Sequence, residues 1–559
     1  MVSKIYKITL LLCLVFYCKN IVYAKTFDEN KVYNYFSALV SLEKNKSIES
    51  LNYFNSSKEL KESHLPYIKK YVFSLVLGEK ISKAISEIKI TKDKKFIDFY
   101  EAQLLLVLDG IKKKDYKKSL YHLSNLEQHE EEGTFDFFVT DYLSEYINLF
   151  KDKKNNSNLG NKFGKISLIN KTLQKCYLGD LSTEKSFENL NNYDEEGSSR
   201  YLFFYSNYLI SQKKFLKAKD IFKEVDPINS TLLIAQAKQW IDKENYDAFT
   251  SIFSCKNPND IIAEFLFIVS TLYSSGDQID KSNFYFNLSN YLNPKFKFNL
   301  ALLADNYFQK EEFSKVKKIL KKFNKKNEIY YWYRIKKIAQ IIVKEKDKNE
   351  SFKYINNKFN DIEKPSLKIT YEMGNVAKGF EKYDLSIKYY TKVLSKLDPN
   401  SIIYPEVLFR RGGSYERIGN EKKSDEDLLK SLSINPDDPH VLNYLAYSWL
   451  ERNYKIDTAI DMLEKAYNQK PDDPYIIDSI GWAYYLTGNY IEAEKLLRKA
   501  VQIMPEDPIV NDHYGDILWK LGRKTQANYF WNNVLTLEDV EEKMKEDIFY
   551  KLLKGPNNT

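Results

Sequence analysis

The chain has 559 residues, and its 85 Lys and Arg against 77 Asp and Glu give a formal net charge of +8 at pH 7. A surplus this small, spread over so many ionic side chains, gives no indication of a nucleic-acid partner. The length exceeds what one hydrophobic core usually serves, so we expect several domains or an array of repeated units.

Residues 1–24 have the pattern of a secretory signal peptide. Lys4 and Lys7 precede an apolar run, and Ala24 is the small residue that a cleavage site requires. The apolar run, residues 8–17, is too short to span a bilayer. We therefore expect cleavage near Ala24, no transmembrane segment in the mature chain, and export to a bacterial periplasm.

From residue 25 to residue 364 the apolar residues recur at intervals of three and four, which predicts a succession of amphipathic helices. We divide this region into degenerate N-terminal repeats at 25–165 and middle repeats at 166–364. The polar segment KDKKNNSNLGNKFGK, at 151–165, marks the boundary between them. No alternation typical of strands occurs, so the expected fold class is all-α.

Only two cysteines, Cys176 and Cys255, follow the predicted cleavage site. Two cysteines do not make a disulfide framework, although an oxidising compartment would tolerate a single bond between them. We expect two buried thiols.

A repeated phrase organises residues 367–541. PDDPH begins at Pro436, PDDPY at Pro471 and PEDPI at Pro505, so successive copies are 35 and 34 residues apart. Each copy is followed by a helix that contains small residues, a short turn and a second amphipathic helix. A fixed period in the thirties is typical of stacked helical arrays.

Small residues stand where the two helices of each pair must approach closely. In the pair that begins at Pro474, Gly481 and Ala493 have this position, and Tyr484 fills the space beside them. The residues that we assign to repeat packing are Gly412, Tyr415, Ala446, Ala459, Gly481, Tyr484, Ala493, Gly515 and Ala527.

These residues and their spacing resemble the tetratricopeptide repeat (TPR). The resemblance implies a right-handed α-solenoid of about twelve TPR or TPR-like helix pairs. The well-formed array at 367–541 comes last and is followed by a capping helix and tail at 542–559.

In TPR proteins the first helix of each pair lines a concave groove that binds extended peptides or partner helices. The resemblance assigns to this groove Asn443, Tyr447, Asp478, Trp482, Tyr485, Asp512, Asp516 and Trp519. Family members that bind a C-terminal carboxylate place a Lys where Asp478 and Asp512 stand, which argues against that ligand. One hypothesis is an acidic and aromatic groove that favours basic or aromatic segments. The alternative is that these Asp residues cap helices and face solvent.

No catalytic motif is present in the sequence: we find no phosphate-binding Gly loop, no nucleophile elbow and no metalloprotease helix. In NDHYGD, at 511–516, Asp512, His513 and Asp516 have the residue types of a metal site, but two further converging ligands are not evident. We expect no catalytic residue, no metal and no cofactor.

The C-terminal repeats are similar to those of exported TPR proteins of Gram-negative, particularly alphaproteobacterial, bacteria. This resemblance implies a non-enzymatic scaffold or adaptor that binds other proteins or peptides in the periplasm, for cell-envelope assembly. An alternative is the accessory arm of a peptidoglycan-processing system, because some lytic transglycosylases have similar helical arms. A third is a peripheral envelope protein that is held to the membrane by a partner.

Overall fold

The computed structural model describes residues 29–44, 46–131, 134–154, 162–192, 199–537 and 540–556. All regular elements in these residues are helices, so the fold class is all-α, as the apolar spacing predicted. The predicted signal peptide at 1–24 lies outside the described residues. Among the described helices, none combines the length and the apolar character that crossing a membrane requires.

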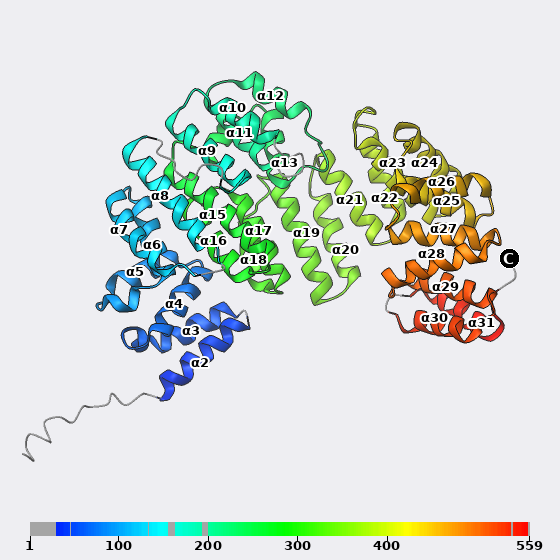
Figure 1. Ribbon diagram of the computed structural model, residues 1–559. Helices are drawn as coiled ribbons and strands as arrows, with labels where there is room; N and C mark the ends of the chain where they lie inside the picture. Colours follow the sequence, from blue (N-terminus) through cyan, green and yellow to red (C-terminus); the bar gives the residue numbers. More distant parts are fainter. Residues whose placement is uncertain are drawn as a thin grey trace, which may run out of the picture. The chain divides into compact units, whose positions relative to one another are not determined.

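The helices form two compact units, drawn in Figure 1 from blue to green and from yellow-green to red. Unit 1 comprises the described residues up to 225 and residues 230–345, and unit 2 comprises 226–229 and the residues from 346 onward. The described residues on both sides of the polar segment at 151–165 therefore belong to unit 1.

The α-helices of unit 1 are α2 (Glu29–Glu43), α3 (Ser47–Ser56), α4 (Leu65–Leu77), α5 (Ile81–Ile90), α6 (Tyr100–Lys112), α7 (Tyr116–Leu126), α8 (Asp136–Asp152), α9 (Lys165–Leu178), α10 (Thr183–Asn191), α11 (Ser199–Ser211), α12 (Phe215–Lys223), α13 (Leu232–Asp242), α14 (Asp247–Ile252), α15 (Pro258–Ser275), α16 (Ile279–Leu292), α17 (Lys297–Gln309), α18 (Phe313–Leu320) and α19 (Glu328–Glu345). Three short 3-10 helices, η1 (Lys58–Glu62), η2 (Lys94–Ile97) and η3 (Glu127–His129), lie between them.

Unit 1 packs its early helices against its late ones. The ring of Phe73, in α4, stacks on that of Phe284, in α16, with 5.2 Å between centroids. The hydroxyl of Tyr307, in α17, donates to the carbonyl of Leu77, 3.2 Å away and 230 residues earlier. In a simple array each pair contacts only its neighbours. Unit 1 departs from that rule, and Figure 1 shows α4 and α6 beside α15–α18.

A buried ion pair lies in the core of unit 1. Arg200, in α11, donates from Nε to Oε1 of Glu264, in α15, over 2.8 Å, and a second bond joins Nη2 to Oε2. The Glu264 side chain is 2% exposed, and the Arg200 guanidinium lies 3.5 Å from the centre of the Phe267 ring. The two charges thus hold α11 and α15 together inside an apolar environment.

A disulfide joins Cys176, at the end of α9, to Cys255, just before α15, with 5.8 Å between the Cα atoms. Beside it, Lys256 donates from Nζ to the carbonyl of Tyr177 over 2.8 Å. The expectation of two free thiols is therefore wrong. The two cysteines are 79 residues apart in sequence, and only the packing of unit 1 brings their backbones together.

Unit 2 is a regular series of helix pairs. Its helices are α20 (Lys348–Asn360), α21 (Leu367–Gly379), α22 (Tyr383–Leu394), α23 (Tyr404–Arg417), α24 (Glu421–Ile434), α25 (Pro439–Glu451), α26 (Ile456–Gln469), α27 (Pro474–Leu486), α28 (Tyr490–Ile503), α29 (Pro508–Lys520), α30 (Lys524–Thr536) and α31 (Glu542–Lys554). The helix α31 follows the last pair, where a capping helix was predicted.

The small residues of unit 2 have the packing role that their spacing predicted. A Cβ added at Gly412, Gly481 or Gly515 would come within 3.0 Å of a side chain on the paired helix. Ala446, Ala459, Ala493 and Ala527 have no exposed surface. Tyr415 and Tyr484 are only half-buried, and the Tyr484 hydroxyl reaches Glu464, 3.0 Å away, on the preceding helix.

The repeated Asp-Pro phrase starts the first helix of three pairs. Asp438, Asp473 and Asp507 each accept hydrogen bonds from two backbone N–H groups of the first turn, and each is followed by the proline that begins the helix. Asp438, Asp473 and Asp507 are therefore the N-terminal caps of these helices. The hypothesis that Asp478 and Asp512 cap helices is wrong, because both lie one turn inside.

Candidate partner-binding site

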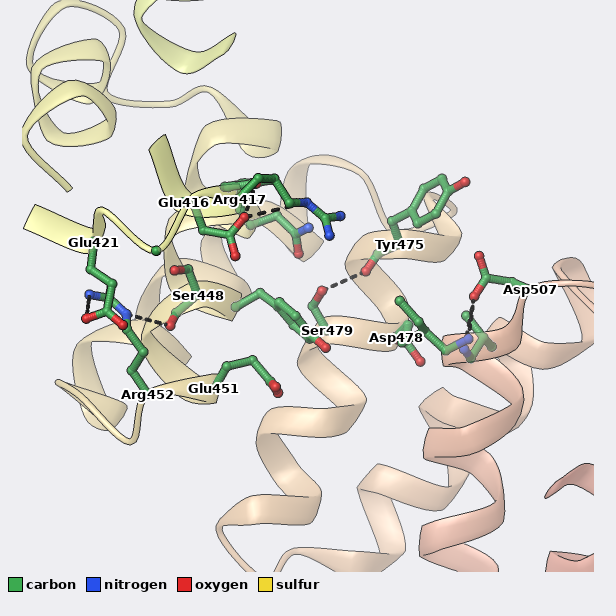
Figure 2. Close-up of a pocket in the computed structure, with 16 residues that line it drawn as sticks. Glu416, Arg417, Glu421, Ser448, Glu451, Arg452, Tyr475, Asp478, Ser479 and Asp507 are labelled. Carbon is green, nitrogen blue, oxygen red and sulfur yellow. Dashed lines mark hydrogen bonds and ion pairs between the residues drawn. The ribbon is translucent and has the colours of Figure 1, made fainter. Parts of the chain in front are cut away.

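A cavity of about 440 Å³ opens between the first helices of four successive pairs, α23, α25, α27 and α29. We call it the unit 2 cavity, and Figure 2 shows the side chains that line it. Three of the predicted groove residues, Asn443, Tyr447 and Asp478, lie in its wall. The structure does not bring the other five to it.

The walls of the cavity combine aromatic and aliphatic surface. Tyr444 and Tyr447 come from α25, Tyr475 is the second residue of α27, and Ile509 and Val510 lie in the first turn of α29. Tyr475 is 60% exposed, so its ring is free to contact a partner. A hollow of this size with apolar walls and a few polar groups is typical of binding sites.

The basic side chains at the cavity are already paired. Arg452 forms an ion pair with Asp425 at 2.8 Å and with Glu421 at 3.4 Å. Arg417 lies 3.7 Å from Glu416, whose carboxylate also accepts from the Tyr444 hydroxyl over 2.9 Å. These contacts join groups from α23, α24 and the end of α25.

Three further carboxylates line the cavity, those of Glu451, Asp478 and Asp507. Glu451 accepts from the indole N–H of Trp482 over 3.1 Å, and Asp507 accepts from the backbone of α29. Burial raises the pKa of the Tyr447 phenol, and the carboxylates of Glu451 and Asp478 raise it further. The phenol thus lies in a negative electrostatic environment.

Asp478 is the most buried acid of the cavity, with 5% of its surface exposed. Its Oδ2 accepts from Nδ1 of His513 over 2.9 Å, and the His513 ring stacks on Trp482 with 4.1 Å between centroids. Burial alone would lower the pKa of His513, but the neighbouring carboxylates, Asp478 foremost, outweigh it and raise the pKa.

Trp482 and Tyr485 serve packing rather than the cavity. The Trp482 ring lies between those of His513 and Tyr485, and the centroid distance to Tyr485 is 4.7 Å. Tyr485 is 4% exposed, which leaves little of its ring for a partner.

The final turns of the chain cover the rest of the predicted stripe. Lys551, in α31, bridges Asp512 at 2.7 Å and Asp516 at 2.8 Å. Burial and the Asp512 carboxylate raise the pKa of Asp516 to about 6. Trp519 packs against the backbone at Gly555, where an added Cβ would come within 2.5 Å of the ring. Of the predicted stripe, only Asn443, Tyr447 and Asp478 therefore line the unit 2 cavity.

Sequence reasoning missed several lining residues. Asn443 and Tyr447 are four apart on α25, and one more step of four reaches Glu451, so helical spacing alone would have found that residue. Glu416 and Arg452 carried no such signal. Nor did Lys551, whose partners depend on where α31 lies.

The histidine and acids of NDHYGD serve the contacts described above. His513 meets Asp478, and the two aspartates share Lys551. Within the described residues, no group of three or more His, Cys, Asp or Glu side chains is arranged to hold a metal ion.

Comparisons with known proteins identify the repeats of unit 2. Residues 405–438 and 474–507 each match the tetratricopeptide repeat family. The first stretch includes α23 and α24, and the second includes α27 and α28. These two pairs of unit 2 are therefore TPRs.

A TPR repeat-containing protein of Pseudomonas aeruginosa, PA4667, is 33% identical over 116 residues, which are 20% of this chain and 20% of that protein. The match thus spans about a fifth of the relative's length. TTC0263, a thermophilic TPR protein of Thermus thermophilus, is 17% identical over 34% of this chain and 100% of its own, with a TM-score of 0.30. MamA of Desulfovibrio magneticus is 18% identical over 32% of this chain and 97% of its own, with a TM-score of 0.27.

Proposed function

We propose that this protein is a non-enzymatic scaffold of the periplasm, which binds segments of partner proteins at the unit 2 cavity and takes part in cell-envelope assembly. The observation that carries the proposal is the cavity itself. It lies on the first helices of successive TPR pairs, and it offers apolar rings, hydrogen-bond acceptors and fixed charges together. Such a combination suits an extended protein segment.

The disulfide supports the proposed compartment. Disulfides persist in oxidising environments such as the periplasm and are rare where thioredoxin and glutathione keep thiols reduced. The Cys176–Cys255 bond agrees with the leader-like pattern of residues 1–24.

Site-specific crosslinking tests the proposed binding site. A photoreactive phenylalanine derivative at Tyr475, which lines the cavity, should capture partner proteins in native cells. The matched control is Tyr529, in α30, because it is also exposed, at 68%, and lies outside the cavity. Adducts specific to position 475 are expected. Identical adducts from both positions, or none from either, would contradict the proposal.

The compartment and the absence of catalysis need their own measurements. After osmotic shock the full chain should fractionate with periplasmic proteins, and maleimide should label Cys176 and Cys255 of the denatured chain only after reduction. Retention in the envelope pellet until a high-salt wash would indicate a peripheral envelope protein. A peptidoglycan zymogram of the purified chain should show no clearing, and a cleared band would favour the peptidoglycan-processing alternative.

A further inference from the structure

We infer that the unit 2 cavity takes the positively charged side chain of an arginine or lysine in the partner's segment. This inference rests on the proposed function, because it specifies the chemistry of the segment that binds. Its evidence is independent of the resemblance to TPR proteins. It comes from unpaired acceptors, from the charges of the wall and from a lysine that already occupies the equivalent position in the next repeat.

Two acceptors in the cavity wall are buried without a hydrogen-bond partner among the described residues: Oδ1 of Asn443 and Oδ1 of Asp478. Each is the fifth residue of its helix, so the two occupy equivalent positions of successive pairs. A buried acceptor that lacks a donor destabilises the protein, and a carboxylate does so more than an amide. A donor that enters the cavity removes this penalty.

The charges of the wall select a cation as that donor. Arg417 and Arg452 are paired with Glu416, Glu421 and Asp425, as described above. Glu451, Asp478 and Asp507 instead bond to an indole, an imidazole and backbone amides. An incoming ammonium or guanidinium therefore meets a complementary potential, which a carboxylate or phosphate would not.

The last pair shows the same position with a cation in place. Asp512 is the fifth residue of α29, as Asp478 is of α27, and the ammonium of Lys551 bonds to it at 2.7 Å. In the preceding pair, the partner of Asp478 is His513, from α29, and it forms a hydrogen bond with only one carboxylate oxygen. The second oxygen remains for a group from outside the chain.

The tyrosines of the cavity wall suit the aliphatic and planar parts of such a side chain. Tyr447 and Tyr475 both line the cavity, and Tyr475 is largely exposed. A guanidinium or ammonium over a tyrosine ring gains a cation–π contact. Lysine and arginine stems also bury their methylene groups on apolar surface.

The test uses the full chain and a fluorescein-labelled pentapeptide, Ala-Tyr-Arg-Tyr-Ala, titrated by fluorescence anisotropy. Three further peptides carry lysine, glutamate or citrulline in place of arginine, and citrulline keeps the shape without the charge. The variant Asp478→Asn removes the negative charge of Asp478 and leaves the other carboxylates of the cavity in place. The control Asp472→Asn removes one charge from the loop before α27, where the carboxylate is 91% exposed and lies outside the cavity.

Wild type should bind the arginine and lysine peptides about tenfold or more tightly than the citrulline peptide, as expected for a hydrogen bond to a charged group. Asp478→Asn should abolish this preference, and Asp472→Asn should retain it. Equal affinities for arginine and citrulline in wild type overturn the inference, and so does an unchanged preference in Asp478→Asn. The wild-type comparison decides the matter even if the variant fails to fold. If crosslinking at Tyr475 captures a partner while the preference is missing, the proposed function stands and only this inference fails.

Discussion

Replacing Gly515 by alanine is expected to destabilise unit 2, whereas the same change at Gly413 is not. In α29, a Cβ at Gly515 would lie 2.3 Å from Nε1 and 2.5 Å from Cδ1 of Trp531. Trp531 has no exposed surface, so its ring has no room to move away. At Gly413 the nearest atoms are Lys378 Nζ at 3.0 Å and the Tyr444 hydroxyl at 3.3 Å. Both are ends of long side chains and can shift.

The magnitude follows from two opposing effects. Alanine in a helix interior is favoured over glycine by about 1 kcal/mol. Overpacking a rigid core costs about 1–3 kcal/mol. The contact at Gly515 is more than about 1 Å shorter than van der Waals distance, which places it at the upper end of that range. We therefore expect Gly515→Ala to lower the free energy of unfolding by about 2 kcal/mol, and Gly413→Ala to leave it unchanged or raise it by up to about 1 kcal/mol.

Urea unfolding of the full chain measures both variants. Four of the six tryptophans, Trp449, Trp482, Trp519 and Trp531, lie in unit 2, so most of the tryptophan fluorescence reports the unfolding of that unit. The unfolding midpoint should fall for Gly515→Ala alone. If Gly515→Ala is as stable as wild type, close helix approach is not what this glycine provides, and the assigned role of the small residues in TPR packing is wrong.

Three further predictions concern charge and covalent structure. Arg200→Met leaves Glu264 buried without its partner and should lower the stability of unit 1 by about 3–5 kcal/mol in thermal unfolding followed by circular dichroism, so an unchanged melting temperature would contradict the ion pair's role. Without reductant, Cys255→Ser should lower the stability of unit 1 by about 2–4 kcal/mol relative to wild type, and dithiothreitol should not change the melting temperature of the variant. If variant and wild type melt at the same temperature without reductant, the disulfide does not stabilise unit 1. The pKa of Asp516 is raised to about 6 from an ordinary value of 3.8. Between these two pH values Asp516 is protonated in the folded state and ionised in the unfolded state, so its contribution to the stability of the fold falls as the pH rises through this range. Asp516→Asn should therefore be more stable than wild type at pH 8, by up to about 3 kcal/mol, and equal to it below about pH 4, and lower stability at pH 8 would refute this.

The spacing of residues predicted unit 2 well because its contacts are local. Gly481 meets the side chain of Leu497 sixteen positions on, within one helix pair. Such contacts repeat with the period of the sequence, so small residues at fixed offsets report them directly. The Asp-Pro phrase was equally informative, since each copy caps the helix that it begins.

The packing of the early helices of unit 1 against its late ones, which we call the closure of unit 1, was not predictable in this way. Nor was the set of residues that lines the cavity. The Cys176–Cys255 bond and the Phe73–Phe284 stack join segments whose separation in sequence has no relation to the repeat. At the cavity, Asp478 was predicted, but its bond to His513 depends on how α29 packs against α27. Long-range contacts of this kind accumulate from small rotations at every helix pair, which residue types do not specify.

The closure of unit 1 also determines when this part of the chain can fold. The Tyr307–Leu77 bond spans 230 residues, so α4 lacks its final partners until α17 has been synthesised. Contacts of such high order slow folding and leave apolar surface open in the meantime. Unit 2 has no such delay among its helix pairs, because each needs only its neighbour. Until α17 is available, the early helices of unit 1 keep apolar surface exposed, so this half of the chain is the more prone to aggregation while it folds.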